Sequence, residues 1–220
     1  MAQSKGIVPK DGMEVIDQVE THVLVAGTKP EDAIQHLGSH TYGEISPSSF
    51  AEILCLVQPK EGEIFVDLGS GTGKAVLLAA SLFPFSESIG IEFVEPLHKA
   101  ALRLQQSFWT MVAERKTTFA ATEIGSKILN RFVFWYDGLD KKLALNWTTQ
   151  WHEMNDTLIK RMEKLRVGAR AITMTRPLDL DKESWVLRHK IVREYGRGKM
   201  TFFLFEKFAM SPQKTAKDTR

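Results

Sequence analysis

The segment from Ile64 to Glu92 constrains the fold more than any other part of this 220-residue sequence. A short apolar run, Ile64-Phe65-Val66, precedes the glycine-rich stretch Asp67-Leu68-Gly69-Ser70-Gly71-Thr72-Gly73, and an apolar helical pattern over 75–82 follows. A second strand pattern covers Ser88 to Glu92. Two such strands joined through a helix pair in parallel, with a right-handed crossover. The sequence therefore predicts a doubly wound α/β sheet.

The rest of the chain extends this unit. Helical patterns precede it, up to Pro59, and strand patterns follow it. Because the two last strand patterns flank Gly196-Arg197-Gly198, we expect an antiparallel hairpin there. The complete prediction is a Rossmann-like, seven-stranded, mostly parallel sheet that finishes with an antiparallel strand inserted. The predicted helices cover 50–57, 75–82, 96–114 and 154–165, and the predicted strands cover 64–66, 88–92, 132–136, 143–147, 171–174, 185–192 and 200–205.

Composition limits the class of protein. With 43% hydrophobic and 25% charged residues, the chain is typical of a globular protein, and its length suits one compact domain. We expect an N-terminal helical segment at 1–40, the main domain at 41–210 and a solvated tail at 211–220. No apolar stretch resembles a signal peptide or a membrane span, which predicts an intracellular protein. The single cysteine, Cys55, lies among apolar neighbours and is expected to be inert filler.

The glycine-rich stretch distinguishes between kinds of nucleotide site. A phosphate-binding P-loop needs four residues between its first glycine and the Gly-Lys pair, whereas Gly69 lies too close to Gly73-Lys74. A dinucleotide site would have a third glycine where Lys74 stands. An acid followed by G-x-G-x-G suits a nucleoside without phosphates. Asp67 can take a cationic group and Glu92 the ribose hydroxyls, so S-adenosylmethionine satisfies both.

A family resemblance rests on motifs along most of the chain. The runs Tyr42-Gly43-Glu44, Phe65 to Gly73 and Gly90-Ile91-Glu92 resemble the Dot-type ("disruptor of telomeric silencing") histone-lysine methyltransferases. The later runs Arg170 to Leu178 and Lys199 to Leu204 look like two further strands of that family. The resemblance implies S-adenosylmethionine as cofactor, a lysine amine of a histone or another protein as methyl acceptor, and residence in the nucleus.

The resemblance also implies the site. The fourth-strand motif of the family, which borders the lysine channel, aligns with Asn146. Aromatic walls would narrow that channel, and Trp147 is one candidate. The expected catalytic residues are Asn146, Tyr42 and Phe203, although Phe203 fits a core position equally well. The expected cofactor-binding residues are Tyr42, Gly43, Glu44, Asp67, Gly69, Ser70, Gly71, Gly73, Lys74, Glu92 and Asp137.

Several alternatives remain open at this point. The acceptor could be a small molecule or another protein residue, or the chain could be a non-catalytic module that binds the cofactor. A metal pair at His36 and His40 is disfavoured because Gly38-Ser39 breaks the helix between them. The net charge of +2 argues against a surface dominated by nucleic-acid contacts. The densest basic run, from Arg188 to Lys199, is either a solvated hairpin face or a weak DNA contact.

Overall fold

The computed structural model of the chain describes residues 44–92, 94–113, 132–136, 151–195 and 198–209. These residues fall into two compact units, 1–141 and 142–220, which are described separately. The predicted boundaries at 40 and 210 and the strand expected at 143–147 lie outside the described residues and stay predictions.

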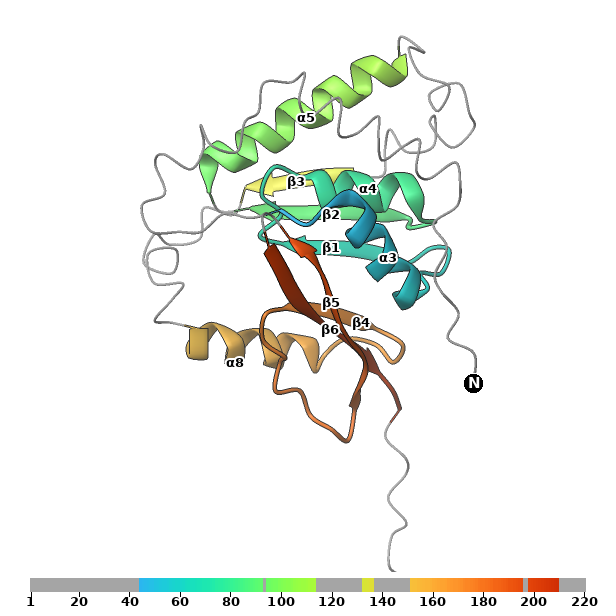
Figure 1. Cartoon of the computed structure of the whole chain (residues 1–220), viewed down its shortest axis with the longest axis vertical. Coiled ribbons are helices and arrows are strands. Elements are labelled where there is room, and N and C mark those ends of the chain that lie inside the picture. The colour runs from blue at the N-terminus through green and yellow to red at the C-terminus, as the bar shows by residue number, and fades with distance from the viewer. Residues whose placement is uncertain (1–43, 93, 114–131, 137–150, 196–197, 210–220) are drawn as a thin grey trace, which may run out of the picture. The chain divides into compact units, whose positions relative to one another are not determined.

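The first unit contains a parallel sheet of order β1-β2-β3, with helices α3, α4 and α5 around it (Figure 1). Pairing of β1 with β2, and of β2 with β3, is parallel throughout. Helix α4 connects β1 to β2 and packs on both strands, whereas α5 packs on β2 and β3. The elements are α3 (Pro47–Val57), β1 (Ile64–Leu68), α4 (Lys74–Leu82), β2 (Glu87–Glu92), α5 (Glu95–Ala113) and β3 (Phe132–Tyr136).

Local sequence explains where α3 begins and ends. The side chain of Ser46 caps its N-terminus by accepting a hydrogen bond from the backbone N–H of Ser49, and Pro47 occupies the first turn. At the other end, Gln58 adopts a left-handed conformation and Pro59 follows. On the inner side, the Phe50 ring lies edge-on against Phe65 of β1, with 5.9 Å between centroids. The helix thus covers the strand that leads into the glycine loop.

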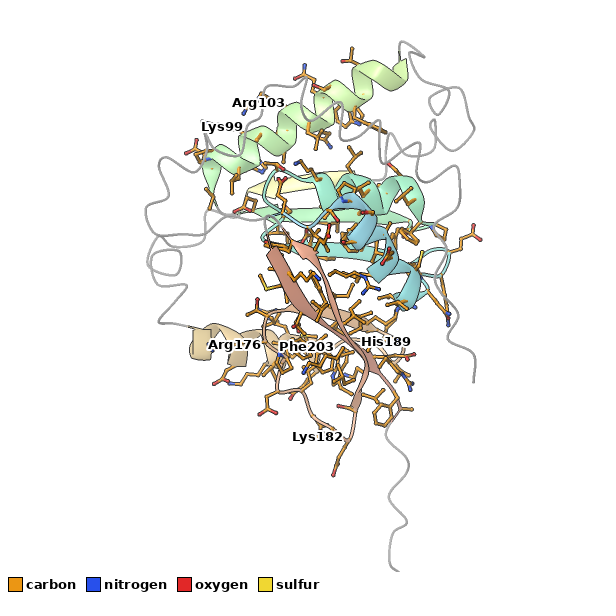
Figure 2. The ribbon with its side chains drawn as sticks, viewed as in Figure 1. Lys99, Arg103, Arg176, Lys182, His189 and Phe203 are labelled. Carbon is orange, nitrogen blue, oxygen red and sulfur yellow. The ribbon has the colours of Figure 1, made fainter. Side chains whose placement is uncertain are left out.

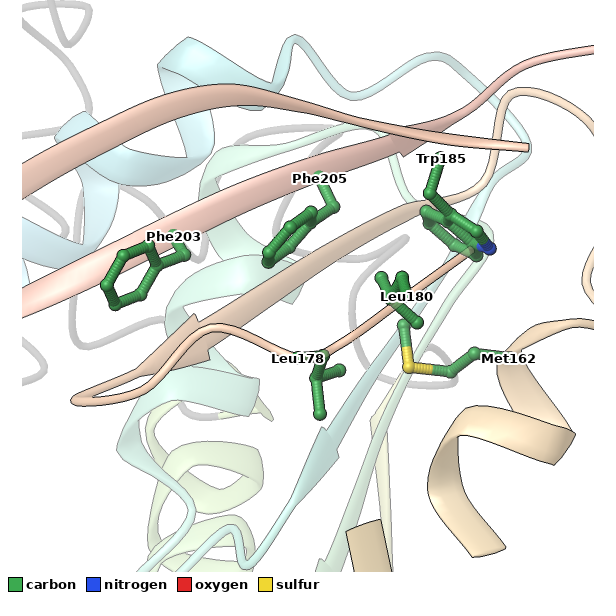
Figure 3. Close-up of a cluster of buried hydrophobic side chains, with 6 residues drawn as sticks. All are labelled: Met162, Leu178, Leu180, Trp185, Phe203 and Phe205. Carbon is green, nitrogen blue, oxygen red and sulfur yellow. The ribbon is translucent and has the colours of Figure 1, made fainter. Parts of the chain in front are cut away.

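The second unit contains an antiparallel sheet of order β4-β6-β5. The central strand β6 (Gly198–Lys207) pairs antiparallel with both β4 (Arg170–Met174) and β5 (Trp185–Tyr195). Helix α8 (Trp151–Met162) contributes Met162 to a hydrophobic cluster against this sheet (Figure 3). The other members of the cluster are Leu178, Leu180, Trp185, Phe203 and Phe205.

These observations confirm the predicted α/β class, with its inserted antiparallel strand and terminal hairpin. The described residues hold six strands in two sheets, and the seventh predicted strand falls at 137–150, outside them. Helix α8 differs from the prediction of 154–165, because it begins at Trp151 and ends at Met162. It ends early because Lys164 and Leu165 donate backbone hydrogen bonds only three residues back, which closes a tight turn.

Candidate functional site: the loop between β1 and α4

The glycine loop between β1 and α4 needs its glycines for conformation. Gly69, Gly71 and Gly73 have φ values of +82°, +57° and +85°, a region that other L-residues rarely adopt. A Cβ at Gly69 would meet no atom within 4 Å, so the torsion angle alone demands glycine there. The loop is held to the next strand because the N–H groups of Gly69 and Ser70 both donate to the Ile91 carbonyl, at 2.8 and 3.1 Å. The backbone path is therefore fixed relative to β2.

Glu92 is the acid at the carboxyl end of β2, and it is buried with 4% of its surface exposed. Its Oε2 accepts the N–H of Gly71 at 2.7 Å, and its Oε1 accepts the N–H of Val94 at the same distance. Hydrogen bonds from backbone N–H groups to a carboxylate are charge-assisted and strong. Glu92 consequently joins the glycine loop to the start of α5 while each oxygen keeps lone pairs for another donor.

The second acid of the site is Asp67. It lies in β1, where it pairs with Gly90 of β2 in the parallel sheet. Burial, and to a smaller extent the neighbouring negative charge of Glu92, together raise the pKa of its carboxyl to about 6. The pair therefore favours a cationic ligand, because a positive group beside Asp67 would relieve both the burial cost and the repulsion.

Glu44 and Lys74 form an ion pair across the loop. The Lys74 ammonium donates to Oε2 of Glu44, and the Thr72 hydroxyl donates to Oε1 at 2.6 Å. Lys74 is the first residue of α4, and the cap residue Gly73 supplies no side-chain hydrogen bond. A cation at a helix N-terminus opposes the helix dipole unless an anion neutralises it. Glu44 does so here, and a carboxylate of a ligand would be a second suitable partner for Lys74.

The arrangement fits the amino-acid and nucleoside parts of S-adenosylmethionine. The buried hydroxyl of Ser70 has no hydrogen-bond partner among the described residues, so it can serve a ligand that approaches the loop. Around the loop stand three carboxylates, those of Asp67, Glu92 and Glu44, against the one ammonium of Lys74, and this excess of negative charge suits a cofactor that carries a sulfonium charge. The uncapped N-terminus of α4 suits its carboxylate.

The structure describes eight of the predicted cofactor residues, all in the first unit, and one predicted catalytic residue, Phe203, in the second unit. Gly71 donates to Glu92 and Lys74 to Glu44, whereas Gly69 and Ser70 donate to the Ile91 carbonyl and Gly73 to the Ser70 carbonyl. The Asp67 carboxyl is close enough to Glu92 to feel its negative charge. Phe203 lies in the hydrophobic cluster of the second unit, 7% exposed, with the Lys190 ammonium 5.6 Å from its ring centroid. These are the contacts of a core residue. Tyr42, Gly43, Asp137, Asn146 and Trp147 lie outside the described residues.

Sequence reasoning missed Thr72 and the partnership between Glu44 and Lys74. The Glu44 and Lys74 side chains are 30 positions apart, so no local pattern connects them, although an uncompensated lysine at a helix start was a usable signal. Cys55 behaves as expected for a packing residue, because burial raises the pKa of its thiol and the Glu52 carboxylate raises it further.

Among the described residues, no group of three or more His, Cys, Asp or Glu side chains is placed to hold a metal ion. None of the helices described is long and apolar enough to cross a membrane.

Comparisons with known proteins agree with this geometry. Residues 31–135 match the sequence model of the family "Histone methylation protein DOT1". A histone-lysine N-methyltransferase of Caenorhabditis elegans, specific for lysine 79 of histone H3, is 35% identical over 88 residues. That alignment covers 38% of this chain and only 9% of the relative, so most of the relative has no counterpart here.

Solved structures support the fold. TrmN from Thermus thermophilus superposes with a TM-score of 0.50 at 18% identity, covering 74% of this chain and 49% of TrmN. A proposed O-methyltransferase from Klebsiella pneumoniae gives 0.51 at 12% identity, covering 89% of this chain and 90% of that protein. The matched segment, 31–135, contains the glycine loop, Glu44 and Glu92. This segment of the chain is therefore similar to the Dot-type family of histone methylation proteins, and the fold is that of the solved methyltransferases.

Proposed function

We propose that the protein is an S-adenosylmethionine-dependent protein-lysine N-methyltransferase that acts on a histone in the nucleus. The observation that carries this proposal is the family match over 31–135, because it includes every described side chain of the candidate cofactor site. The relative from Caenorhabditis elegans modifies a histone lysine, which supports a histone as the acceptor class. It spans far more sequence than this chain, so the acceptor needs direct testing.

Each described residue has a proposed task in cofactor binding. Glu92 would accept hydrogen bonds from the ribose hydroxyls while it keeps its hydrogen bonds from the backbone N–H groups of Gly71 and Val94. Lys74 and the N-terminus of α4 would hold the carboxylate of the amino-acid part. Asp67 would take the ammonium group, and Ser70 would donate or accept one further hydrogen bond. Glu44, through Lys74 and Thr72, would position the loop.

The bound cofactor would supply an electrophilic methyl group on a sulfonium, open to in-line displacement by a lysine nitrogen. Such an in-line displacement needs a neutral amine, correct orientation and exclusion of water rather than a strong base. The carboxylates of this unit therefore serve to bind and orient.

The acceptor side of the site remains a proposal on sequence grounds. Asn146, Tyr42 and Trp147 are the candidate channel residues, with Asn146 as a polar positioning group and the aromatic rings as walls. Phe203 is a weaker candidate because its ring belongs to the hydrophobic cluster.

The cofactor claim and the acceptor claim are tested separately. Calorimetric titration of the full chain with S-adenosylhomocysteine should show binding, and no binding at millimolar ligand would refute the cofactor claim. Labelled S-adenosylmethionine is then offered with nucleosomes, with free histones and with a metabolite extract. Label on a histone lysine supports the proposal, whereas label on metabolites alone identifies a small-molecule methyltransferase. Cofactor binding without transfer to any acceptor identifies a non-catalytic binding module.

A further inference from the structure

Lys74 is an unusual residue for its place in the fold. It is the first residue of α4, and the first turn of that helix contains no acid. A cation at a helix N-terminus is unfavourable, because the N–H groups there already carry a partial positive charge. The Lys74 side chain is only 24% exposed, so solvent compensates this cost only in part. The position therefore needs an explanation beyond helix formation.

Glu44 holds the Lys74 ammonium at this place. Its Oε2 accepts a hydrogen bond from that ammonium, and its Oε1 accepts one from the Thr72 hydroxyl at 2.6 Å. Thr72 is 3% exposed within the glycine loop, so one end of the arrangement is fixed. A carboxylate bound through both oxygens has little freedom to rotate, and a lysine paired with it loses much of its own rotational freedom. Glu44 therefore fixes where the positive charge of Lys74 lies.

Stability alone does not account for this ion pair. Solvent reaches both side chains in part, and ion pairs of that kind contribute little to folding. An acid at the start of α4 would favour the helix without any partner. A stable helix therefore needs neither Lys74 nor the residue that neutralises it.

The start of α4 offers hydrogen-bond donors to an anion. Gly73 supplies no side-chain cap for the first N–H groups of the helix. Among the described residues, Glu44 is the one acceptor for the Lys74 ammonium, which has three N–H donors. Independently, Ser70 of the same loop is 8% exposed, and its hydroxyl has no partner among those residues. A buried hydroxyl without a partner is rare, which indicates that the loop is built to receive a polar group.

Acceptors stand on the strand side of the same loop. Asp67 belongs to β1, and Glu92 ends β2 with its carboxylate bound to the Gly71 N–H. These carboxyls attract a cation, whereas Lys74 and the N–H groups of α4 attract an anion. The two sides of the loop therefore carry opposite charges. A ligand that holds an anion and a cation close together, as an α-amino acid does, matches both sides.

We propose that Glu44 sets the ligand specificity of this site, because it holds Lys74 in place for the carboxylate of the ligand. Glu44 is a positioning residue, since it acts on the ligand through Lys74. The proposal rests on the proposed function and refines it. The site accepts adenosyl thioethers and sulfoniums that end in an amino acid. It discriminates against those that have lost the carboxylate, such as decarboxylated S-adenosylmethionine, which keeps both the sulfonium and the amine.

The opposite role for Glu44 is that of an internal anion, which competes with the ligand carboxylate for Lys74. The contacts favour positioning. One ammonium can donate to two carboxylates at the same time, and Thr72 holds Glu44 independently of the acceptors that Lys74 has. The two roles predict opposite effects of Glu44→Gln on ligand affinity, so experiment can distinguish them.

The test compares two ligands by calorimetric titration of the full chain. The first is S-adenosylhomocysteine, and the second is its decarboxylated analogue, which differs only by the carboxylate. The parent chain should bind S-adenosylhomocysteine at least about tenfold more tightly than the analogue, the effect of one charge-assisted hydrogen bond. Lys74→Met should lower the affinity for S-adenosylhomocysteine about tenfold, and Glu44→Gln about three- to tenfold. Neither variant should change the affinity for the analogue, whereas a purely structural role of the ion pair would weaken both ligands equally.

Two further variants serve as controls. The charge-swapped variant E44K/K74E restores an ion pair but places a carboxylate at the start of α4. It should remain folded in urea denaturation and lose the preference for S-adenosylhomocysteine, because two carboxylates repel each other. Lys99→Met breaks the ion pair of Lys99 with Glu95 on α5, and it should change neither affinity; Lys99 is labelled in Figure 2.

Three results would overturn the proposal. The first is equal affinity of the parent chain for the two ligands, and the second is an equal loss of both ligands in Glu44→Gln. The third is tighter binding of S-adenosylhomocysteine by Glu44→Gln, which would identify Glu44 as a competing anion. A parent chain that binds both ligands equally refutes only the specificity claim, whereas one that binds neither ligand also refutes the cofactor claim.

Discussion

Asp67 offers the sharpest test of the site, because replacing it should strengthen the fold while weakening the ligand. Its carboxyl has a pKa of about 6 in the folded protein against an ordinary value of 3.8, with burial as the main cause and Glu92 as the second. A rise in pKa of this size means that the folded protein favours the protonated carboxyl over the ionised one by about 3 kcal/mol more than the unfolded chain does. The ionised carboxylate therefore costs the folded state up to about 3 kcal/mol at pH 8.

The sign of the pH dependence follows from proton uptake. Between pH 6 and pH 4 the folded state holds a proton on Asp67 that the unfolded chain does not, so stability from this group rises as the pH falls. In D67N that contribution is absent. We expect D67N to exceed the parent chain in unfolding free energy by up to about 3 kcal/mol at pH 8, and by about half of that at pH 5.

The assay is urea denaturation of both chains at pH 8 and pH 5, with E61Q as a control that removes one exposed carboxylate. In parallel, calorimetry with S-adenosylhomocysteine should show D67N binding about 5- to 150-fold more weakly, the loss of one charge-assisted hydrogen bond. A D67N protein that is less stable at pH 8, or whose gain is equal at both pH values, would refute the reasoning. Unchanged ligand affinity would remove Asp67 from the site.

Four other substitutions test three further sets of contacts. Glu92→Gln should lower the unfolding free energy by about 1–3 kcal/mol, because the Gly71 and Val94 N–H groups lose a charged acceptor. Urea denaturation measures this loss, with E61Q as the control variant. A loss below about 0.5 kcal/mol, the size expected for an ordinary surface change, would contradict the prediction. Lys74→Met should weaken S-adenosylhomocysteine binding about tenfold. The double variant with Glu44→Gln should lose less binding free energy than the sum of the two single variants, because both residues act through one ion pair. Fully additive losses of binding free energy in calorimetry would show that the pair does not act as a unit. Phe205→Ala should destabilise the protein by about 3–5 kcal/mol, because the ring is 7% exposed within the hydrophobic cluster; a loss under 1 kcal/mol would place that cluster outside the cooperative core.

The sequence predicted the described elements well where a local pattern carries the information. Apolar runs bounded by glycines located β1 and β2, and the pattern of the last two strands located the β5–β6 hairpin. The boundaries of α8 were wrong by three residues at each end, because hydrophobic spacing at Leu158, Met162 and Leu165 does not reveal the tight turn that closes after Met162. Pattern reasoning therefore located elements better than their ends.

The candidate site shows the same limit at the level of side chains. The glycines, Asp67 and Glu92 were predictable because each has a fixed place in a strand, loop and helix unit. The contact between Glu44 and Lys74 depends on how the chain folds back, and Phe203 was equally compatible with a channel or a core until its neighbours were known. In the second unit, sequence alone could not show that Arg188 of the hairpin pairs with Glu206 or that the Lys190 ammonium lies over the Phe203 ring.

Net charge illustrates why sums over a sequence mislead about partners. Electrostatic interactions between exposed groups are largely screened beyond about 8 Å at physiological ionic strength, so a phosphate responds to the cations around it rather than to the whole chain. Residues 1–141 contain 12 Lys and Arg against 18 Asp and Glu, an acid excess that suits a site that holds a sulfonium. Residues 142–220 contain 17 against nine, a basic excess that suits contact with a polyanion. Both demands are met by a chain whose total is only +2. The near-neutral total therefore conceals the opposite charges of the two units, and it does not by itself argue against a cationic cofactor or an anionic partner.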